Sequence, residues 1–401
     1  MDCKTPPPGF DPRYITPPPY TDRPAKDFNA LAIDISGKCN LACNYCSEIA
    51  SQPVRPAMSP ETLEAAWQFL FPKDTDRKDF SIHLGSGEPF LNFPLLEKTA
   101  KLVEQTKAER NVDIRVFLTT NATLIDDEML EWLIATDWEI KISLDGPAVI
   151  HDKWRVLPGG GGTYDRVAKV LTHLVERIPD RVIACTVLSR GNDPAEVFAA
   201  VEKSGVRKVE MVPVAHADES LRLKAEDIER FRKFIKNYAA RYLEEDVEAN
   251  PPTIICRFRQ CMMRLMGYQL ARVYCAAGDS YLAVSPQGEL YPCARFIGLD
   301  QYKVGHVGTG LDPEAEEKFR HEVARPYERR ETCCQCWAAP LCSGPCYAFA
   351  EVFGPGDGKP IDYHCDFIRA IAEAAVFLYY QLKEKNPERL LFFLPGIDDI
   401  L

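Results

Sequence analysis

Short runs of β-branched and apolar residues alternate with longer segments of helical periodicity along the first half of the chain. The apolar runs predict six strands, at residues 29–36, 80–84, 113–119, 139–144, 181–188 and 208–214. Apolar positions at helical spacing between these runs predict helices over 60–71, 93–108, 126–134, 164–177 and 194–204. Six strand–helix units in sequence predict an α/β fold with a parallel sheet and outer helices. Short right-handed connections leave two arrangements: an open doubly wound sheet, or a partial (β/α)6 barrel of the TIM type.

This alternation ends near residue 222, which indicates more than one domain. A long helical segment over 224–243 leads to a stretch rich in cysteine, glycine and aromatic residues, and a closing helix is expected near 366–384. The first residues are rich in proline, which predicts an extended arm with no core of its own. The predicted parts are an arm (1–27), a partial barrel (28–222), a helical linker (223–270), a cysteine-rich domain (271–370) and a C-terminal helix with its tail (371–401).

Composition and charge exclude several classes of protein. A net charge of −11 argues against a general nucleic-acid binder, which usually carries a basic surface. The N-terminal sequence lacks the basic and then apolar pattern of a secretory signal. No apolar run approaches the roughly 18 residues that a membrane span needs. The sequence therefore predicts a cytoplasmic protein without a nucleic-acid or membrane partner.

The cysteine content is the exceptional feature of the composition. The chain contains 15 cysteines, most of them in two regions, 39–46 and 275–365. In a chain without an export signal, clustered cysteines indicate metal binding or reactive thiols more than disulfides. Both regions are therefore candidates for metal binding.

The first region places three cysteines, Cys39, Cys43 and Cys46, in a loop after the first predicted strand. Structural zinc needs four closed ligands, and the nearest histidine, His83, is far along the chain. No fourth cysteine follows at a ferredoxin-like spacing. Three thiolates on a four-iron cluster would leave one iron open to a small molecule.

With this triplet the chain resembles the radical S-adenosylmethionine (radical SAM) enzymes, in which the open iron is chelated by SAM. Tyr45 stands at the aromatic position of that motif, which implies a place beside the adenine. The sequence GSGEP resembles the family's GGEP loop and implies Gly87, Glu88 and Pro89 as SAM-binding residues, with Ser86 in place of a glycine. The resemblance implies a [4Fe–4S] cluster and reductive cleavage of SAM to a 5′-deoxyadenosyl radical, which abstracts hydrogen from a substrate.

Two later stretches extend the resemblance to the SAM site. TTNAT (119–123) resembles the family's TNG turn and implies Asn121 as a SAM-binding residue, with Ala122 replacing the glycine. SLDGPAVIHDKWR (143–155) is similar to a stretch of one large branch, which implies that Ser143 faces the ribose or carboxylate of SAM. Ser143 and Asp145 could instead end a strand and shape a turn. Arg155 could clamp a carboxylate or form a surface ion pair.

The second region resembles the SPASM extension of many radical SAM enzymes, through the spacing of seven cysteines. The implied ligands are Cys333, Cys336, Cys342 and Cys365 for one auxiliary [4Fe–4S] cluster, and Cys275, Cys293 and Cys346 for another. Zinc ribbons are the alternative on spacing alone. The second set lacks a fourth ligand, which Cys261, Cys256 or a substrate thiol could supply.

SPASM enzymes mostly modify peptides or proteins, and this sequence resembles the maturases that cross-link ribosomally made peptides. The predicted reaction is formation of a thioether or carbon–carbon cross-link. Sulfatase-maturing (formylglycine-forming) enzymes are an alternative, weakened because Ala294 stands where they carry an aspartate base. Small-molecule dehydrogenation is another. An iron–sulfur electron carrier or a zinc scaffold would be the non-enzymatic alternative.

The resemblance also implies partners. The substrate would be a precursor peptide, and flavodoxin or ferredoxin would donate electrons, because four-iron centres reach very negative potentials. About 27 residues precede the first predicted strand, where many peptide maturases carry a leader-binding domain. A leader would therefore bind elsewhere or through a separate protein. The sequence identifies no residue that takes up the substrate proton.

Overall fold

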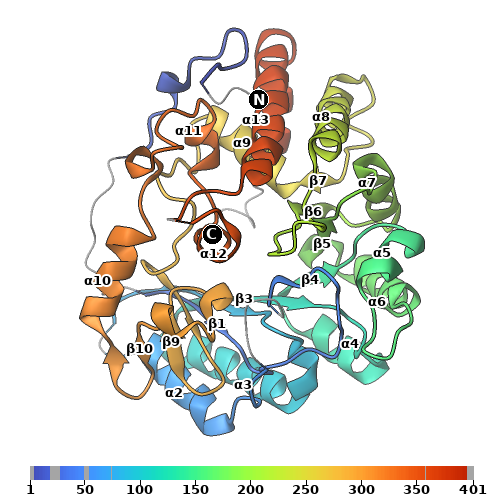
Figure 1. The fold of residues 1–401 in the computed structure, drawn as a ribbon. Helices are drawn as coiled ribbons and strands as arrows, with labels where there is room; N and C mark the ends of the chain where they lie inside the picture. Colours follow the sequence, from blue (N-terminus) through green and yellow to red (C-terminus); the bar gives the residue numbers. More distant parts are fainter. Residues whose placement is uncertain (1–3, 19–27, 49–53, 74, 357, 395–401) are drawn as a thin grey trace. The chain divides into compact units, whose positions relative to one another are not determined.

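The computed structural model describes residues 4–18, 28–48, 54–73, 75–356 and 358–394, in two compact units. The first, here called the sheet unit, contains residues 22–185 and 275–324. The second, the helical unit, contains residues 1–21, 186–274 and 325–401. Each unit therefore combines segments that are far apart in the sequence, as the colours of Figure 1 show. The predicted serial division into five parts remains a prediction.

Parallel strands in sequence order form the centre of the sheet unit. They are β1 (Ala30–Ile33), β2 (Asp79–Leu84), β3 (Asp113–Thr120), β4 (Glu139–Ser143) and β5 (Val182–Leu188), whose last residues belong to the helical unit. Neighbouring strands pair in parallel, with Ala32 opposite His83 and His83 opposite Phe117. The predicted α/β fold with a parallel sheet is confirmed.

The cysteine-rich segment adds strands that the sequence did not predict. These are β8 (Tyr281–Val284), β9 (Glu289–Tyr291), β10 (Gly305–His306) and β11 (Gly310–Leu311). The strand β8 pairs in parallel with the outer side of β1, and β9, β10 and β11 continue in antiparallel order. The two cysteines of the sheet unit's late segment, Cys275 and Cys293, thus flank a strand that borders β1.

Buried and more exposed residues alternate along the strands, so that one face of the sheet packs against helices. In β3, Ile114, Val116 and Leu118 are buried, while the residues between them are half-buried or exposed. Successive side chains of a strand point to opposite faces, so one face supplies the core. The helices of the sheet unit are α2 (Pro60–Leu70), α3 (Phe93–Arg110), α4 (Asp127–Ala135), α5 (Ala148–Trp154), α6 (Tyr164–Arg177) and α10 (Pro313–Glu322).

Helix starts follow the capping residues of the sequence. Ser59 accepts a hydrogen bond from the Thr62 backbone N–H at 3.2 Å, directly before Pro60 begins α2. Asp126 likewise accepts from the Met129 N–H at 2.8 Å at the start of α4. Such side chains satisfy backbone donors that have no partner within the helix. Among the described residues, no helix combines the length and apolar character that crossing a membrane requires.

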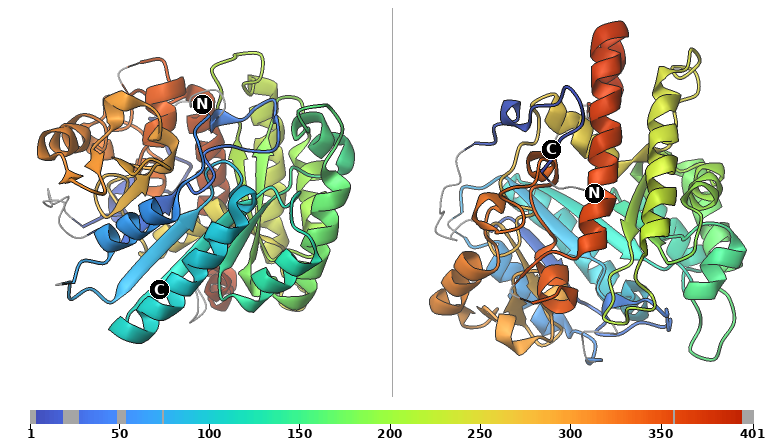
Figure 2. Two further views of the ribbon diagram at one scale, coloured as in Figure 1. Left: turned by 90° about the horizontal axis from the view of Figure 1, so that it is seen from below. Right: turned by 45° about the horizontal axis from the view of Figure 1, so that its top comes forward.

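The helical unit packs its long helices on one another. It contains the end of β5, β6 (Lys208–Pro213), β7 (Ile254–Ile255), and the helices α7 (Pro194–Lys203), α8 (Ala225–Ala240), α9 (Cys256–Leu265), α11 (Ala339–Cys342), α12 (Tyr347–Phe353) and α13 (Asp362–Lys385). Figures 1 and 2 show α8 and α13 side by side. Their contact includes Phe231 stacked on Phe367, with ring centroids 3.8 Å apart.

The described part of the proline-rich arm packs against other segments of the helical unit. Phe10 and Ile15 are buried, and the Phe10 ring meets the Trp337 ring edge-on at 6.0 Å. The Arg272 side chain donates to the backbone carbonyls of Pro17 and Pro18. Phe10 and Ile15 thus pack residues 4–18 within the helical unit.

Candidate active site

The three early cysteines lie together in the loop that follows β1. Burial raises the pKa of the Cys39 thiol to about 12, and the nearby charges of Glu88, Cys43 and Cys46 add to the increase. Burial likewise raises the pKa of Cys43 to about 11, although Arg155 opposes the effect. Cys43 and Cys46 both act on Cys39, so the three thiols of this loop lie close enough together to share one site. Iron would have to displace their protons on binding.

Backbone hydrogen bonds fix this cluster loop (residues 36–48) to the segment that ends α5. The Ala42 N–H donates to the Val156 carbonyl at 2.8 Å, and the Asn44 N–H donates to the Trp154 carbonyl at 3.0 Å. The Tyr45 ring lies 5.9 Å from the Trp154 ring. The resemblance of 143–155 to a family stretch therefore coincides with a direct contact to the cysteine loop.

A buried charged pair supports the same contact. Arg155 donates to the Asp145 carboxylate through Nε at 2.9 Å and Nη2 at 3.2 Å, and the Tyr45 hydroxyl donates to the same carboxylate. Asp145 is 0% exposed. Burial lowers the pKa of Arg155, but the charges of Asp145, Tyr45 and Cys43 outweigh it and the pKa is raised. The surface ion pair considered for Arg155 is therefore wrong, since the pair is buried.

Glu88 connects two of the sequence stretches that resemble SAM-binding loops. Its carboxylate accepts hydrogen bonds from the Thr120 hydroxyl at 2.7 Å and the Asn121 N–H at 2.8 Å. A third comes from the Phe90 N–H at 3.1 Å. Burial raises the pKa of Glu88 to about 7, against the effect of these hydrogen bonds. Glu88 thus braces the loop internally, and its predicted contact with SAM remains a prediction.

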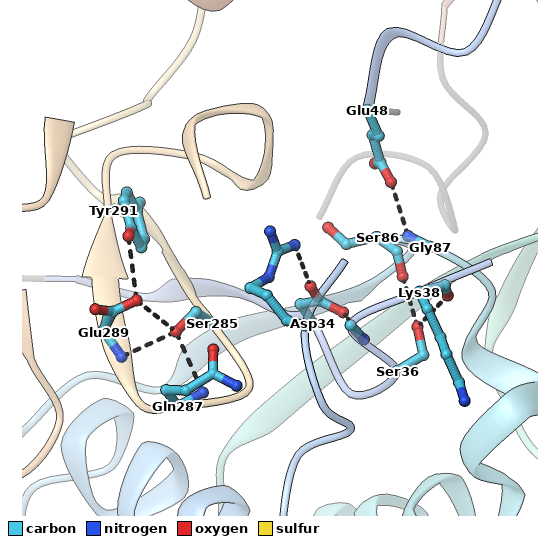
Figure 3. Close-up of polar contacts among 12 residues, drawn as sticks. Asp34, Ser36, Lys38, Glu48, Ser86, Gly87, Ser285, Gln287, Glu289 and Tyr291 are labelled. Carbon is cyan, nitrogen blue, oxygen red and sulfur yellow. Dashed lines mark hydrogen bonds and ion pairs between the residues drawn. The ribbon is translucent and has the colours of Figure 1, made fainter. Parts of the chain in front are cut away.

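Gly87 lies against the cluster loop. Its φ is +62°, and a Cβ at this position would lie 2.2 Å from the Lys38 carbonyl oxygen. Figure 3 shows the Glu48 carboxylate directed at the Gly87 N–H, a hydrogen bond of 2.8 Å. The Ser36 hydroxyl lies 3.1 Å from both the Ser86 and the Lys38 carbonyl oxygens. Ser86 fills the first glycine position without disturbing this approach, and Pro89 starts the following short 3-10 helix.

Asn121 points toward the cluster loop. Its side-chain amide donates to Cys39 Sγ at 3.6 Å and to the Asn40 side chain at 2.9 Å. Ala122 takes a left-handed φ of +59°, the conformation for which a glycine would carry no steric penalty. Ser143 is buried at the end of β4, where its backbone pairs with Cys185. The structure brings Asn121 to the thiols, and the predicted SAM contacts of both side chains remain predictions.

Four of the late cysteines gather in the helical unit. Burial raises the pKa of Cys333 to about 11, and Cys342 and Cys336 contribute to the increase. Burial also raises the pKa of Cys365, with further contributions from Cys342, Cys333 and Cys336. The predicted ligand set of one auxiliary cluster is thus brought together, whereas the neighbouring Cys334 is exposed.

The other predicted set divides between the units. In the sheet unit, burial and then the charges of Cys293 and Cys275 raise the pKa of Tyr281, so both thiols lie near the same ring. Cys346 belongs to the helical unit, where it precedes α12. Cys261 is buried on α9, and the charge of Cys342 acts on it. Cys261 therefore lies with the four-cysteine set of the helical unit.

The donor chemistry of these groups fits iron–sulfur clusters. No group of three or more His, Cys, Asp or Glu side chains within the described ranges is arranged to hold a single metal ion. A four-iron cluster takes one thiolate at each corner of a larger body and suits more widely spaced thiols. No disulfide joins any cysteine that the structure describes.

The order of elements and the position of the cysteine loop agree with a known family. Residues 33–203 match the family model of the radical SAM superfamily. The part of the chain that carries the three early cysteines therefore matches a radical SAM domain. This superfamily uses a [4Fe–4S] cluster and SAM, so Cys39, Cys43 and Cys46 are the residues that would hold that cluster.

Similar proteins extend beyond the radical SAM domain. The chain is 23% identical over 358 residues to the cysteine-type anaerobic sulfatase-maturating enzyme of Clostridium perfringens (strain 13 / Type A), covering 85% of this chain and 94% of the relative. A solved structure of anSMEcpe with bound AdoMet shares the fold, with a TM-score of 0.74 and 20% identity over 91% of this chain and 97% of that one. Streptococcus suis SuiB bound to precursor peptide SuiA matches with a TM-score of 0.58 and 17% identity, covering 84% of this chain and 76% of that one.

Proposed function

We propose that this radical SAM protein is a maturase that abstracts hydrogen from a ribosomally made peptide and forms a thioether or carbon–carbon cross-link. A [4Fe–4S] cluster with bound SAM supplies the chemistry, namely reductive cleavage of SAM to methionine and a 5′-deoxyadenosyl radical. The proposal includes two auxiliary [4Fe–4S] clusters, at the two late cysteine sets. It also includes flavodoxin or ferredoxin as electron donor and a cytoplasmic location.

The observation that carries the proposal is the convergence of three loops on one group of thiols. The cluster loop is joined to Gly87 by Glu48, to Asn121 by its amide, and to Asp145 by Tyr45. These contacts hold the thiols in place through side chains from the ends of β1, β2, β3 and β4. Residues at one end of neighbouring parallel strands form a common site, because the connecting loops meet there.

A peptide substrate is supported by what similar proteins are said to bind. SuiB was solved with a precursor peptide, and anSMEcpe was solved with the peptide Kp18Cys. We infer a peptide or protein side chain as substrate for this chain as well. Sequence resemblance favours cross-linking, because Ala294 cannot serve as the base that an aspartate would supply at this position.

Sulfatase maturation is the second candidate, favoured by the similarity to the Clostridium perfringens enzyme over most of both chains. The two candidates differ in the product. Oxidation of a cysteine or serine to formylglycine leaves an aldehyde that reacts with a hydrazide probe. A cross-link leaves no aldehyde, and it prevents separation of the two linked residues in tandem mass spectrometry.

The test is anaerobic incubation of the reconstituted enzyme with SAM, a reductant and candidate peptides. These peptides are those encoded beside the gene and a synthetic sulfatase-type peptide containing cysteine. We expect loss of two hydrogens from a neighbouring peptide, with a link between residues in the fragment spectrum. Cys334→Ala should retain activity, because this thiol is exposed and lies outside both ligand sets. An aldehyde product on the sulfatase peptide, with the neighbouring peptides unchanged during confirmed SAM cleavage, would replace cross-linking by the second candidate.

A further inference from the structure

Two arginines of α9 face the four-cysteine group of the helical unit. Arg257 and Arg264 are seven residues apart, with Cys261 between them, so all three lie on one side of the helix. That side packs on α11, the short helix that ends with Cys342 (Figure 1). Arg264 is only 2% exposed. An amphipathic helix normally turns such residues to solvent, so the inward position needs a physical reason.

Hydrogen bonds to neutral groups hold both guanidinium groups against α11. Arg257 Nη2 donates to the Cys342 carbonyl at 3.0 Å, and its Nη1 donates to the Gln260 side chain. Arg264 Nη1 donates to the Leu341 carbonyl at 2.6 Å, and its Nε donates to the Gln269 carbonyl at 3.2 Å. Arg257 Nε is buried with no hydrogen-bond partner in the described structure.

No carboxylate within the described ranges forms an ion pair with either guanidinium. The groups whose negative charge would raise the pKa of Arg257 are Tyr274, Cys342 and Cys261, and none of them is a carboxylate. A buried charge is costly unless an opposite charge accompanies it. The two neighbouring positive charges therefore indicate an anion at the thiol group.

The cysteine loop of the radical SAM domain provides a contrast. The cation that acts on Cys43 there, Arg155, is paired with Asp145 at 2.9 Å. In the helical unit, Arg369 acts on Cys336 and Cys365 but is paired with Asp366 at 2.7 Å. Arg257 and Arg264 thus carry positive charge that no carboxylate of the described residues neutralises. A [4Fe–4S] centre held by four thiolates carries two negative charges when oxidised and three when reduced.

We propose that Arg257 and Arg264 are counter-charges of the auxiliary cluster at Cys333, Cys336, Cys342 and Cys365, and that they raise its reduction potential. This inference rests on the auxiliary cluster of the proposed function. Positive charge stabilises the reduced cluster, which carries one more negative charge, over the oxidised one. With an effective dielectric of roughly 20 and a separation of about 10 Å, one charge changes the equilibrium between the two forms by about tenfold.

The test is a potentiometric titration of the full-length, anaerobically reconstituted protein, followed by electron paramagnetic resonance. Changing Cys39, Cys43 and Cys46 to alanine removes the first cluster from the spectra, and a sodium dithionite titrant with mediators supplies one electron per cluster. The signal to follow is the one lost in Cys342→Ala. At a fixed potential, Arg257→Gln and Arg264→Gln should each lower the ratio of reduced to oxidised cluster about tenfold, or about 59 mV for one electron.

Matched variants separate charge from packing. Arg259→Gln changes the same charge on another side of α9, where Arg259 donates to the Phe393 carbonyl, and should leave the ratio within about twofold of the parent. Arg257→Lys and Arg264→Lys keep the charge and should keep the ratio. If the glutamine variants lose the cluster while the lysine variants keep it, as iron analysis would show, the counter-charge role is supported. If the lysine variants lose it as well, the inference is overturned.

Equal potentials in loaded glutamine variants and parent would also overturn the inference, as would a parent protein without an auxiliary signal. These results are distinguishable from failure of the proposed function. Cleavage of SAM and modification of a peptide by the unaltered enzyme depend on the first cluster and the substrate. They can therefore be established whether or not α9 affects the auxiliary potential.

Discussion

Removing the negative charge of Asp145 is the perturbation whose effect follows most directly from the structure. Asp145→Asn leaves the shape of the side chain nearly unchanged but leaves Arg155 as a buried, unpaired cation. Breaking a buried pair by removing one partner costs about 3–5 kcal/mol. Tyr45→Phe removes one hydrogen bond to the same carboxylate and should cost about 1–3 kcal/mol.

Urea unfolding of the anaerobic protein, followed by tryptophan fluorescence, measures the free energy of unfolding of both variants. Trp154 lies beside Tyr45 and reports on this region. Combining Asp145→Asn with Arg155→Met removes both charges, so the double variant should be more stable than Asp145→Asn alone. A cost below about 1 kcal/mol for Asp145→Asn, the value of an exposed pair, would refute the reasoning. A double variant less stable than both single variants would refute the assigned role of the unpaired charge.

Three further predictions concern the loops around the thiols. Gly87→Ala should reduce SAM cleavage at least tenfold with the iron content retained, because its Cβ would lie 2.2 Å from the Lys38 carbonyl oxygen; unchanged cleavage would contradict this. Glu88→Gln should lower the free energy of unfolding by about 1–3 kcal/mol, measured by urea, because an amide has one acceptor oxygen and cannot accept from both the Thr120 hydroxyl and the Asn121 N–H. Burial lowers the pKa of His151 to about 4, so the native state binds fewer protons than the unfolded state between about pH 6.5 and 4. Stability should therefore fall as the pH drops through this window, and His151→Gln should reduce that fall, which parallel urea titrations at several pH values would show.

The strands and helices of the first half were predictable because their signals are local. Each of the six predicted strands lies within a few residues of β1 to β6, and the helix predicted at 164–177 coincides with α6. Period-two and helical patterns depend on neighbouring residues, which the sequence shows directly. The cysteine loop was equally visible, because its three thiols lie within eight positions.

Long-range pairing was not predictable in the same way. The strand β8 pairs with β1 although some 250 residues separate them, and the local pattern of Tyr281–Val284 does not indicate which strand it pairs with. The inward-facing arginines of α9 were missed for another reason. A hydrophobicity pattern assigns arginine to the solvent side, whereas Arg257 and Arg264 face thiols. Side-chain roles such as the internal brace of Glu88 also depend on contacts across loops.

The most direct measurement is the formation of 5′-deoxyadenosine by the reconstituted chain, incubated anaerobically with SAM and dithionite. The account predicts that the unaltered chain forms it, and that changing Cys39, Cys43 and Cys46 to alanine abolishes it while iron bound at the late cysteines remains. No product from a fully iron-loaded chain, or equal product from the alanine variant, would contradict the assignment of these three thiols.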